Sequence, residues 1–438
     1  MKKDIAVFGA GAAGMFVALA AQARGLSVAL FEPHARAPNN FAISGGLFPA
    51  AGSRFQRACG IEDSPQAWLD DLRAFAPGMV NERIAQSVAE ALPLATDFLV
   101  DGCAAPFRFL PDMIAPGHNR RRFHSIEPAS GAAMHAWFRQ AVQAQPAIAW
   151  FEALPQVRRQ ARGFAVDGAQ DVLEVDQLVL AGGGFGANAQ MVERFIPGMA
   201  GALNNGSVTN DGSAMALGLQ WGAQVWGMDG YQGQGHTNPG GATRLGMAIP
   251  SLGGILVNRQ GQRFVAEDIG PSALAPRVLS QPGGVALEVF DAAIEAQLGN
   301  HWAYQQALAA GQVMSAGSVH ELAAQAGVDA QALAQTLEQV AACSSGQSDP
   351  LGRRAFARSL SAPLKASWVT GALSHTQGGL LTDADGRVLL EDGQTMTGVF
   401  AAGGCAAGLS GRGADGYLPG NGLAQAFGLG WRLAQALG

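Results

Sequence analysis

The residues with the clearest capacity for chemistry are three glycines near the start of the chain. Gly9, Gly11 and Gly14 follow a short apolar run at residues 5–8 with GxGxxG spacing. The first glycine permits a tight turn, the second lets a pyrophosphate approach the backbone, and the third allows a helix to pack closely. Glu32 follows a second apolar run, where a carboxylate can accept a hydrogen bond from a ribose hydroxyl. Glycine clusters also occur in ordinary turns, but this order of residues predicts a dinucleotide site.

The elements that must position these residues are a strand, a helix and a second strand. We expect the helix to begin at Ala12 and Ala13 and to close at residues 24–25. Its first N–H groups have no partner within the helix, so they can point at bound phosphates. Residues 26–31 form the pattern of a buried strand that leads into Glu32. Together these segments predict a βαβ unit.

Composition limits the class of protein. The chain has 438 residues, 48% hydrophobic and 14% charged, which is enough for two domains and a large core. A net charge of -6 gives no basic surface, so nucleic acid is not an expected partner. The four cysteines form no CxxC pair, which argues against metal, iron–sulfur or haem sites and fits reduced thiols in a cytoplasmic protein. No apolar segment of about twenty residues occurs, so we expect a soluble, unprocessed chain without membrane insertion.

Further glycine-rich segments recur along the chain. We expect residues 39–46 to form a loop against a flat ligand, and residues 175–186 to form a buried strand that runs into a second glycine turn. Asp211 lies near the start of a helix at 213–222, where a carboxylate favours the helix dipole. Another strand ends in glycines near the last helix. The candidate cofactor-binding residues of these segments are Ser44, Gly45, Gly46, Ala181, Gly182, Gly183, Asp211, Gly403, Gly404, Asn421, Gly422 and Leu423.

The most basic segment lies at residues 118–124. It is either a solvated loop, which we favour, or a site that holds substrate or cofactor anions. After residue 236 the character of the sequence changes, and Ser318 and Asp329 are placed to cap two helices. We therefore expect a discontinuous cofactor-binding domain and an inserted cap domain. Their ranges are 1–236 with 353–438 for the first, and 237–352 for the second.

Taken together, these motifs resemble the flavoprotein subunits of the fumarate reductase and succinate dehydrogenase family, which includes soluble fumarate reductases, tricarballylate dehydrogenase and 3-ketosteroid dehydrogenases. The resemblance implies an α/β fold, in which a Rossmann-like FAD-binding domain of the glutathione-reductase type carries an inserted α+β cap. It also implies FAD as the cofactor and hydride transfer between flavin N5 and a carbon, with a proton exchanged at the neighbouring carbon next to a carbonyl. Succinate dehydrogenases attach the flavin through a histidine that Asn39 replaces here, so we expect non-covalent FAD.

The resemblance also indicates which residues act on the substrate. His236 matches a substrate-binding histidine and His375 matches the histidine of the HTxGG segment, although either could be structural. The catalytic arginine of fumarate reductases is missing from residues 266–272, and Tyr417 stands where their carboxylate-clamping arginine lies. A phenol suits a carbonyl oxygen better than a carboxylate. Tyr417 is therefore the expected polariser of a carbonyl, with a packing role as the alternative.

The ketosteroid dehydrogenases of this family use tyrosines to polarise a ketone and to remove the neighbouring proton. Tyr231 is our weaker candidate for the base. Arg412 could receive a carboxylate of the same substrate, or it could brace backbone carbonyls in a glycine loop. We expect a flavin-dependent dehydrogenase of the CH–CH class that desaturates a small carbonyl compound, such as a cyclic ketone or a keto acid.

Two alternatives stay open. One is a fumarate-reductase-type reductase of an unsaturated carboxylate, in which Arg412, Arg244 or Arg277 clamps the anion. The other is a flavoprotein that only passes electrons to a partner, against which a tight polar cavity would argue. The motifs identify no electron acceptor. Because the chain has one complete βαβ fingerprint, neither NADH nor NADPH is expected as the direct hydride donor.

Overall fold

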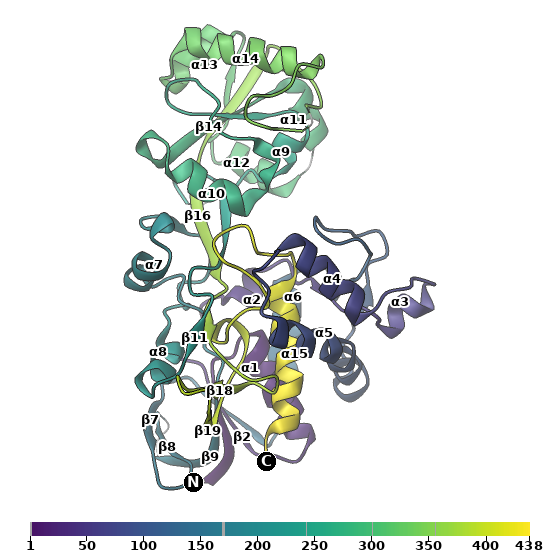
Figure 1. Cartoon of the computed structure of the whole chain (residues 1–438), viewed down its shortest axis with the longest axis vertical. Helices are drawn as coiled ribbons and strands as arrows, with labels where there is room; N and C mark the ends of the chain where they lie inside the picture. Colours follow the sequence, from purple (N-terminus) through teal and green to yellow (C-terminus); the bar gives the residue numbers. More distant parts are fainter. Residues whose placement is uncertain (1, 169–170, 242, 300, 355) are drawn as a thin grey trace. The chain divides into compact units, whose positions relative to one another are not determined.

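The computed structural model describes residues 2–168, 171–241, 243–299, 301–354 and 356–438. The chain divides into two compact units (Figure 1). Unit 1 comprises Met1–Ile196, Gly206–Tyr231 and His375–Gly438, and unit 2 comprises Pro197–Asn205 and Gln232–Ser374. The predicted cap at 237–352 falls inside unit 2, which extends beyond it on both sides. Its use as a substrate cap stays a prediction.

A mainly parallel sheet forms the centre of unit 1, with the strand order β18-β19-β9-β1-β2-β6. Its strands are β1 (Lys2–Phe8), β2 (Val28–Phe31), β6 (Ile148–Phe151), β9 (Leu173–Leu180), β18 (Arg387–Leu389) and β19 (Thr395–Ala401). Ile5, Ala6 and Val7 of β1 are fully buried, as expected for a strand that is covered on both faces. The predicted α/β fold with a parallel sheet is confirmed.

The strand register places the ends of neighbouring strands side by side. Phe8 of β1 lies opposite Phe31 of β2 and Leu180 of β9, and Leu180 lies opposite Ala401 of β19. The carboxyl ends of these parallel strands therefore meet at one edge of the sheet, which is where open α/β sheets bind their ligands. The loops after them carry the predicted glycine segments and Glu32.

The first and last helices of the chain share one core in unit 1. The longer helices are α1 (Ala12–Ala23), α4 (Pro65–Phe75), α5 (Glu82–Asp97), α6 (Gly131–Gln143) and α15 (Asn421–Ala436). Both α1 and α5 pack against α15. Phe427 of α15 stacks on Phe138 of α6, with ring centroids 5.5 Å apart, and lies 5.7 Å from Phe16 of α1. Two ends of the chain thus build the same unit.

Unit 2 contains a mainly antiparallel sheet covered by helices, so the predicted α+β character is confirmed. Its strands include β10 (Leu203–Asn204), β13 (Ile255–Val257), β14 (Val285–Asp291), β15 (Met314–Ala316) and most of β16 (Leu364–Thr376). Its helices include α10 (Pro271–Leu279), α11 (Ala292–Leu298), α13 (Val319–Ala326) and α14 (Ala330–Ser344). Strands β14 and β16 pair along their length, with Leu287 opposite Trp368. Ser318 and Asp329 cap α13 and α14 as predicted.

Shorter elements complete the units, and one of them corrects an expectation. We predicted a loop at residues 39–46, but Asn40–Ile43 forms a short helix, α2, because the Asn39 side chain accepts a hydrogen bond from the Ala42 N–H at 3.1 Å. No helix within the described ranges is long and apolar enough to cross a membrane. The remaining α-helices and strands are α3 (Arg54–Ala58), α7 (Ala189–Phe195), α8 (Ser213–Gln220), α9 (Ala248–Ser251), α12 (Trp302–Ala309), β3 (Phe48–Pro49), β4 (Arg108–Phe109), β5 (Phe123–Ser125), β7 (Gln156–Arg159), β8 (Phe164–Asp167), β11 (Val225–Trp226), β12 (Tyr231–Thr237) and β17 (Gly379–Leu380).

Candidate active site

The first glycine turn joins β1 to α1. Gly9 has a φ of +96°, in the region that favours glycine, and a Cβ there would lie 2.5 Å from the carbonyl oxygen of Ala181. A Cβ on Gly14 would overlap the carbonyl oxygen of Gly9. No heavy atom of the described residues lies within 4 Å of the Cβ position of Gly11. Packing therefore explains Gly9 and Gly14, whereas Gly11 borders space that a ligand can fill.

The N-terminus of α1 begins at this turn. Gly11 is its N-cap residue, and no side-chain hydrogen bond caps the helix there, which suits a phosphate. The Glu32 carboxylate is held against the same turn, since its Oε2 accepts from the Ala10 N–H at 2.8 Å and its Oε1 accepts from the His34 N–H at 3.0 Å. Each carboxylate oxygen keeps a further lone pair that can accept from a ribose hydroxyl.

Two further glycine turns lie against the first one. A Cβ on Gly403 would lie 2.9 Å from the Cβ of Ala13, and a Cβ on Gly404 would lie 2.9 Å from the backbone nitrogen of Gly184. A Cβ on Gly183 would overlap an asparagine side chain. These positions leave no room for larger residues. The turns after β1, β9 and β19 thus meet at one edge of the sheet, as the register requires.

The serine–glycine loop and Asp211 are held by local hydrogen bonds. Ser44 Oγ donates to the carbonyl oxygen of Phe41 at 2.8 Å and accepts from the Gly46 N–H at 3.1 Å. Asp211 is exposed, and its carboxylate accepts from the Ser213 N–H at 2.9 Å at the start of α8. The predicted interaction of Asp211 with the start of this helix is therefore confirmed. A contact of either segment with a cofactor stays a prediction.

His375 and Tyr417 come together in unit 1. Their rings meet edge to face, with centroids 5.0 Å apart and an angle of 82° between the ring planes. Burial lowers the pKa of His375 and raises the pKa of Tyr417 to about 12, because desolvation disfavours each charged form. Both side chains are therefore neutral near pH 7. A neutral phenol and a neutral imidazole suit hydrogen bonding to an uncharged carbonyl group.

Helix α15 begins close to this pair. Its N-cap residue, Gly420, has a φ of +88° and supplies no side-chain cap. Asn421 is buried, and its Nδ2 donates to Ser410 Oγ at 3.0 Å, whereas its Oδ1 has no partner among the described residues. The Cβ position of Gly422 lies 3.9 Å from Cε1 of His375. An uncapped helix start and an unpaired buried oxygen mark a place where a ligand can complete the hydrogen bonding.

His236 belongs to unit 2 and is fully buried there. Its Nδ1 lies 3.2 Å from Oε2 of Glu288, and its Nε2 lies 3.2 Å from Sδ of Met247. Both ring nitrogens thus have partners inside unit 2. This arrangement favours the structural alternative that the sequence left open for His236.

The other two predicted residues differ in exposure. Arg412 is exposed to solvent. Tyr231 is buried, and its N–H donates to the carbonyl oxygen of Gly413 at 3.0 Å, which places its backbone beside the loop that leads to Tyr417. Their roles in catalysis stay predictions.

The solvated loop predicted at residues 118–124 is wrong for Arg122, which is fully buried. Arg122 Nε donates to a carboxylate oxygen of Asp63 at 2.9 Å, and its Nη1 donates to Asp71 at 2.7 Å. Both carboxylates are buried as well, so the three groups form an internal ion-pair cluster. Arg122 is therefore committed to these partners rather than to a substrate anion.

His118 links this cluster to the loop that carries Tyr417. Its Nε2 donates to the carbonyl oxygen of Pro419 at 2.9 Å, and its Nδ1 lies 3.5 Å from Arg122 Nη1. Burial lowers the pKa of His118 to about 4, so the ring is neutral and can donate from one nitrogen while it accepts at the other. The sequence did not predict the hydrogen bond from His118 to Pro419, because no local pattern connects these two residues.

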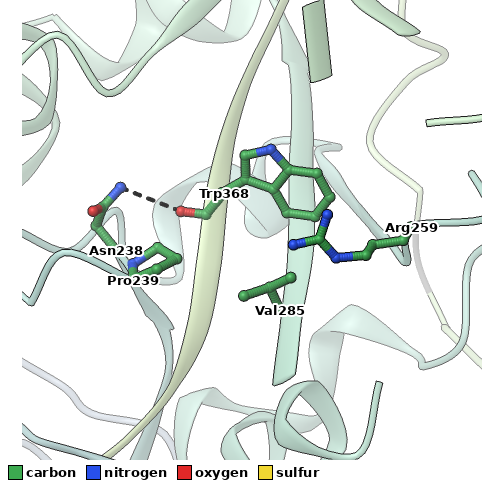
Figure 2. A pocket seen from close by; sticks show the side chains of 5 residues that line it. All are labelled: Asn238, Pro239, Arg259, Val285 and Trp368. Atoms are coloured by element: carbon green, nitrogen blue, oxygen red, sulfur yellow. Dashed lines mark hydrogen bonds between the residues drawn. The ribbon is translucent and has the colours of Figure 1, made fainter. Parts of the chain in front are cut away.

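A cavity of about 350 Å³ on unit 2 is lined by Asn238, Pro239, Arg259, Val285 and Trp368 (Figure 2). The Arg259 guanidinium lies over the indole of Trp368, 5.0 Å from the ring centroid, and the Asn238 amide donates to the Trp368 carbonyl oxygen at 3.3 Å. None of these five side chains exchanges a proton near neutral pH. The cavity therefore lacks an acid or a base.

The chain is similar in sequence to a known protein family and to several known proteins. The model of a family described as FAD binding domain matches residues 4–423. The chain is 27% identical to the NADH:fumarate oxidoreductase of Klebsiella pneumoniae (strain 342), over 93% of this chain and 45% of that protein. It is 24% identical to the 4-oxocyclohexanecarboxylate 2-dehydrogenase of Sinomonas cyclohexanicum, over 96% of this chain and 92% of that protein.

A solved structure has the same fold. The open conformation of a flavocytochrome c3 fumarate reductase superposes with a TM-score of 0.84 at 23% identity, over 99% of this chain and 77% of that chain. The chain spans less than half the length of the first curated relatives that it matches, at 45% and 27% of those proteins. Their shared region is therefore only one part of those larger proteins.

Proposed function

The chain belongs to the family described as FAD binding domain, and from this premise we propose that it is an FAD-dependent dehydrogenase that introduces a double bond next to the carbonyl of a cyclic ketone or keto acid. The observation that carries the proposal is the contact between two neutral side chains, His375 and Tyr417, close to the start of α15. The printed name of the Sinomonas cyclohexanicum relative describes a dehydrogenase of a cyclic keto acid, which supports this substrate class.

The residues at the edge of the sheet fit FAD. Gly11 and the uncapped start of α1 would receive the pyrophosphate, and Glu32 would accept from the ribose. The unpaired Asn421 Oδ1 and the uncapped start of α15 would add hydrogen bonds at a second place. Asn39 has no group that forms a covalent bond to a flavin, so we propose that the cofactor is held without one. When bound, FAD supplies the hydride acceptor at N5.

Tyr417 has the central role in the proposed reaction. Its hydroxyl would donate a hydrogen bond to the carbonyl oxygen of the substrate and so stabilise the negative charge that develops when the neighbouring C–H loses its proton. Because burial raises the pKa of Tyr417 to about 12, the phenol keeps the proton that this role requires. His375 would face the same substrate from the neighbouring position.

Reduction of an unsaturated carboxylate is the second candidate function. It is favoured by the printed name of the Klebsiella pneumoniae relative, which acts on fumarate. This reaction needs a cation that clamps the carboxylate. Arg412 is exposed, and Arg244 in unit 2 is a partly buried cation whose pKa is lowered by burial. Tyr417 would then contribute little.

The substrate in either case is a small molecule, and we propose an electron acceptor other than a nicotinamide. We also propose a cytoplasmic location, which the four cysteines support because none of them forms a disulfide in the described residues.

Flavin absorbance without oxygen tests the proposal. The FAD-loaded protein is mixed with a panel of saturated cyclic ketones and keto acids, and the chemically reduced protein is mixed in parallel with fumarate and acrylate. Bleaching by a saturated ketone or keto acid is the expected result. Reoxidation by an unsaturated carboxylate, without any bleaching in the first arm, would establish the reductase instead. A protein that responds in neither arm would match an electron carrier.

A further inference from the structure

Gln377 lies two residues after His375 and is buried in unit 1. Its backbone is fixed on both sides, because its N–H donates to the carbonyl oxygen of Gly230 at 2.8 Å and its carbonyl oxygen accepts from the Gly408 N–H at 2.8 Å. From this fixed backbone the side-chain amide reaches His375, with Gln377 Nε2 3.0 Å from Nδ1 of the imidazole.

We propose that Gln377 is a positioning residue that sets the tautomer of His375. Its amide donates a hydrogen bond to Nδ1, so the imidazole carries its proton on Nε2 and presents that N–H as a donor to the carbonyl oxygen of the substrate. This inference rests on the proposed function and deepens it, because it assigns His375 to carbonyl polarisation beside Tyr417 and excludes it as the base.

The groups around Nδ1 of His375 differ in whether they can donate or accept a hydrogen bond. A neutral imidazole has one donor nitrogen and one acceptor nitrogen, and the bond made by one of them decides the state of the other. An amide Nε2 can only donate, so at 3.0 Å it requires an acceptor at Nδ1. The carbonyl oxygen of Thr376 can only accept, and it lies at 3.3 Å from the same nitrogen. The two neighbours therefore demand opposite tautomers, and the amide makes the shorter contact.

Burial supports a neutral ring, because it lowers the pKa of His375 below the ordinary value. The imidazole is therefore not a doubly protonated cation near pH 7, and the choice between its two tautomers is a real one. No other described side chain forms a hydrogen bond with this ring. The Tyr417 ring and the backbone at Gly422 also lie near the imidazole, and neither carries a charge.

The tautomer of His375 decides whether it acts as a hydrogen-bond donor or as a base in the proposed reaction. With a proton on Nε2, His375 and Tyr417 are two neutral donors on neighbouring positions, which is the arrangement that stabilises a developing oxyanion. With a proton on Nδ1, Nε2 would instead be a base. Gln377 thus decides between a polariser and a base at the same position without touching the substrate.

The side chain at position 377 can be changed to reverse this choice. In Gln377→Glu a carboxylate of similar size can only accept, so it favours a proton on Nδ1. In Gln377→Met the side chain has a similar size but cannot donate the hydrogen bond, so Nδ1 is free to donate to the carbonyl oxygen of Thr376. Gln224→Glu is the matched control, because residue 224 is exposed in the same unit and receives the same added charge.

The measurement is ¹⁵N NMR of histidine-labelled, FAD-loaded protein near pH 7.5, with the His375 signals assigned from their loss in His375→Gln. Wild type and Gln224→Glu are expected to show a protonated Nε2 and an unprotonated Nδ1. Both Gln377 variants are expected to show a protonated Nδ1, while their flavin absorbance shows that the fold is intact. Once a substrate is known, each should also lose about 10²–10³ in the rate of flavin reduction, the usual cost of one oxyanion donor.

Two results would overturn the proposal. The first is a wild-type spectrum with the proton on Nδ1. The second is a protonated Nε2 that persists in Gln377→Met, because the amide would then not be what sets the tautomer. These spectra are independent of turnover, so a protein with the expected tautomers that desaturates no ketone would refute the proposed function and leave the role of Gln377 standing.

Discussion

At the scale of single residues, Gly11 and Gly14 belong to one motif but are required for different reasons. A Cβ on Gly14 would overlap the backbone of the preceding turn, whereas a Cβ on Gly11 would meet no described atom within 4 Å. The chain itself therefore needs Gly14 in order to fold, and only a ligand needs Gly11. This difference separates folding from cofactor binding within a single turn.

Gly11→Ala and Gly14→Ala should accordingly have opposite effects. We expect Gly14→Ala to lower the free energy of unfolding of the apoprotein by about 1–3 kcal/mol or more, the usual cost of overpacking. Gly11→Ala should leave that value nearly unchanged but weaken FAD binding, since the added methyl group occupies the space next to the helix N-terminus. Denaturant unfolding and FAD titration check the pair. Normal FAD binding by Gly11→Ala would show that the pyrophosphate binds elsewhere.

Asn39 leads to a second prediction at this scale. Its side chain caps α2 and donates to the carbonyl oxygen of Ala10 at 3.2 Å, so it is used by the fold and carries no nucleophile for the flavin. Acid precipitation of the FAD-loaded protein should release all of the yellow colour into the supernatant. Flavin that stays with the denatured chain after washing would refute non-covalent binding.

At the scale of elements, the buried side chains of the segment from His118 to His124 brace the loop that leads into α15. Arg122 is paired with two buried carboxylates, and His118 donates to the loop that leads into α15. His124 is buried beside them, with its Nδ1 2.9 Å from the Arg122 carbonyl oxygen. These contacts connect the β5 region to the start of the last helix. They require a charged Arg122 with charged carboxylates, and a neutral His118.

The two histidines predict how stability depends on pH. Burial lowers the pKa of His118 and of His124 to about 4, below the value of about 6.5 expected in the unfolded chain. The unfolded state therefore binds more protons between these two pH values. The contribution of these histidines to the free energy of unfolding is fully present above pH 6.5 and is lost as the pH decreases towards 4. Each histidine can contribute up to about 3 kcal/mol to this loss.

Denaturant unfolding of the apoprotein at several pH values measures this dependence. His118→Gln should have a smaller slope between pH 6.5 and 4 than wild type, whereas the exposed His34→Gln should keep the wild-type slope. If His118→Gln kept the wild-type slope, a lowered pKa of buried His118 would not be a cause of the pH dependence.

Elements with a local sequence pattern could be predicted, whereas those that depend on distant residues could not. The βαβ unit and its glycine turn have local patterns, so their type and start could be predicted from residues 5–32 alone. Helix α2 could not, because glycine and asparagine nearby suggested a loop while one cap from Asn39 was enough to form a short helix. The ion pairs of Arg122 could not either, since Asp63 and Asp71 lie far away in the sequence and the basic run around Arg122 suggested solvent.

At the scale of the whole molecule, the chain crosses between its two units four times. It enters unit 2 at Pro197 and returns at Gly206, then leaves unit 1 again after Tyr231, within β12, and returns at His375, near the end of β16. Unit 1 alone contains the three glycine turns, Glu32, His375 and Tyr417. The contact between the two candidate side chains could not be predicted from the sequence, because it depends on how the returning strand and the last loop pack rather than on any shared motif.

One complete dinucleotide fingerprint in the chain predicts that neither NADH nor NADPH reduces the flavin directly. Without oxygen, either nucleotide at micromolar concentration should leave the flavin oxidised. A parallel sample with a chemical reductant should be bleached in the same time. Rapid bleaching by a nicotinamide would reveal a second nucleotide site on this chain.

The most direct test of the central claim is the anaerobic rate of flavin reduction by substrate in Tyr417→Phe and Arg412→Ala, measured side by side. If Tyr417 polarises a carbonyl, Tyr417→Phe should keep its FAD and its absorbance spectrum but lose about 10²–10³ in rate, whereas the exposed Arg412→Ala should keep most of its rate. A nearly normal rate in Tyr417→Phe together with an inactive Arg412→Ala would contradict the account and assign the site to a carboxylate.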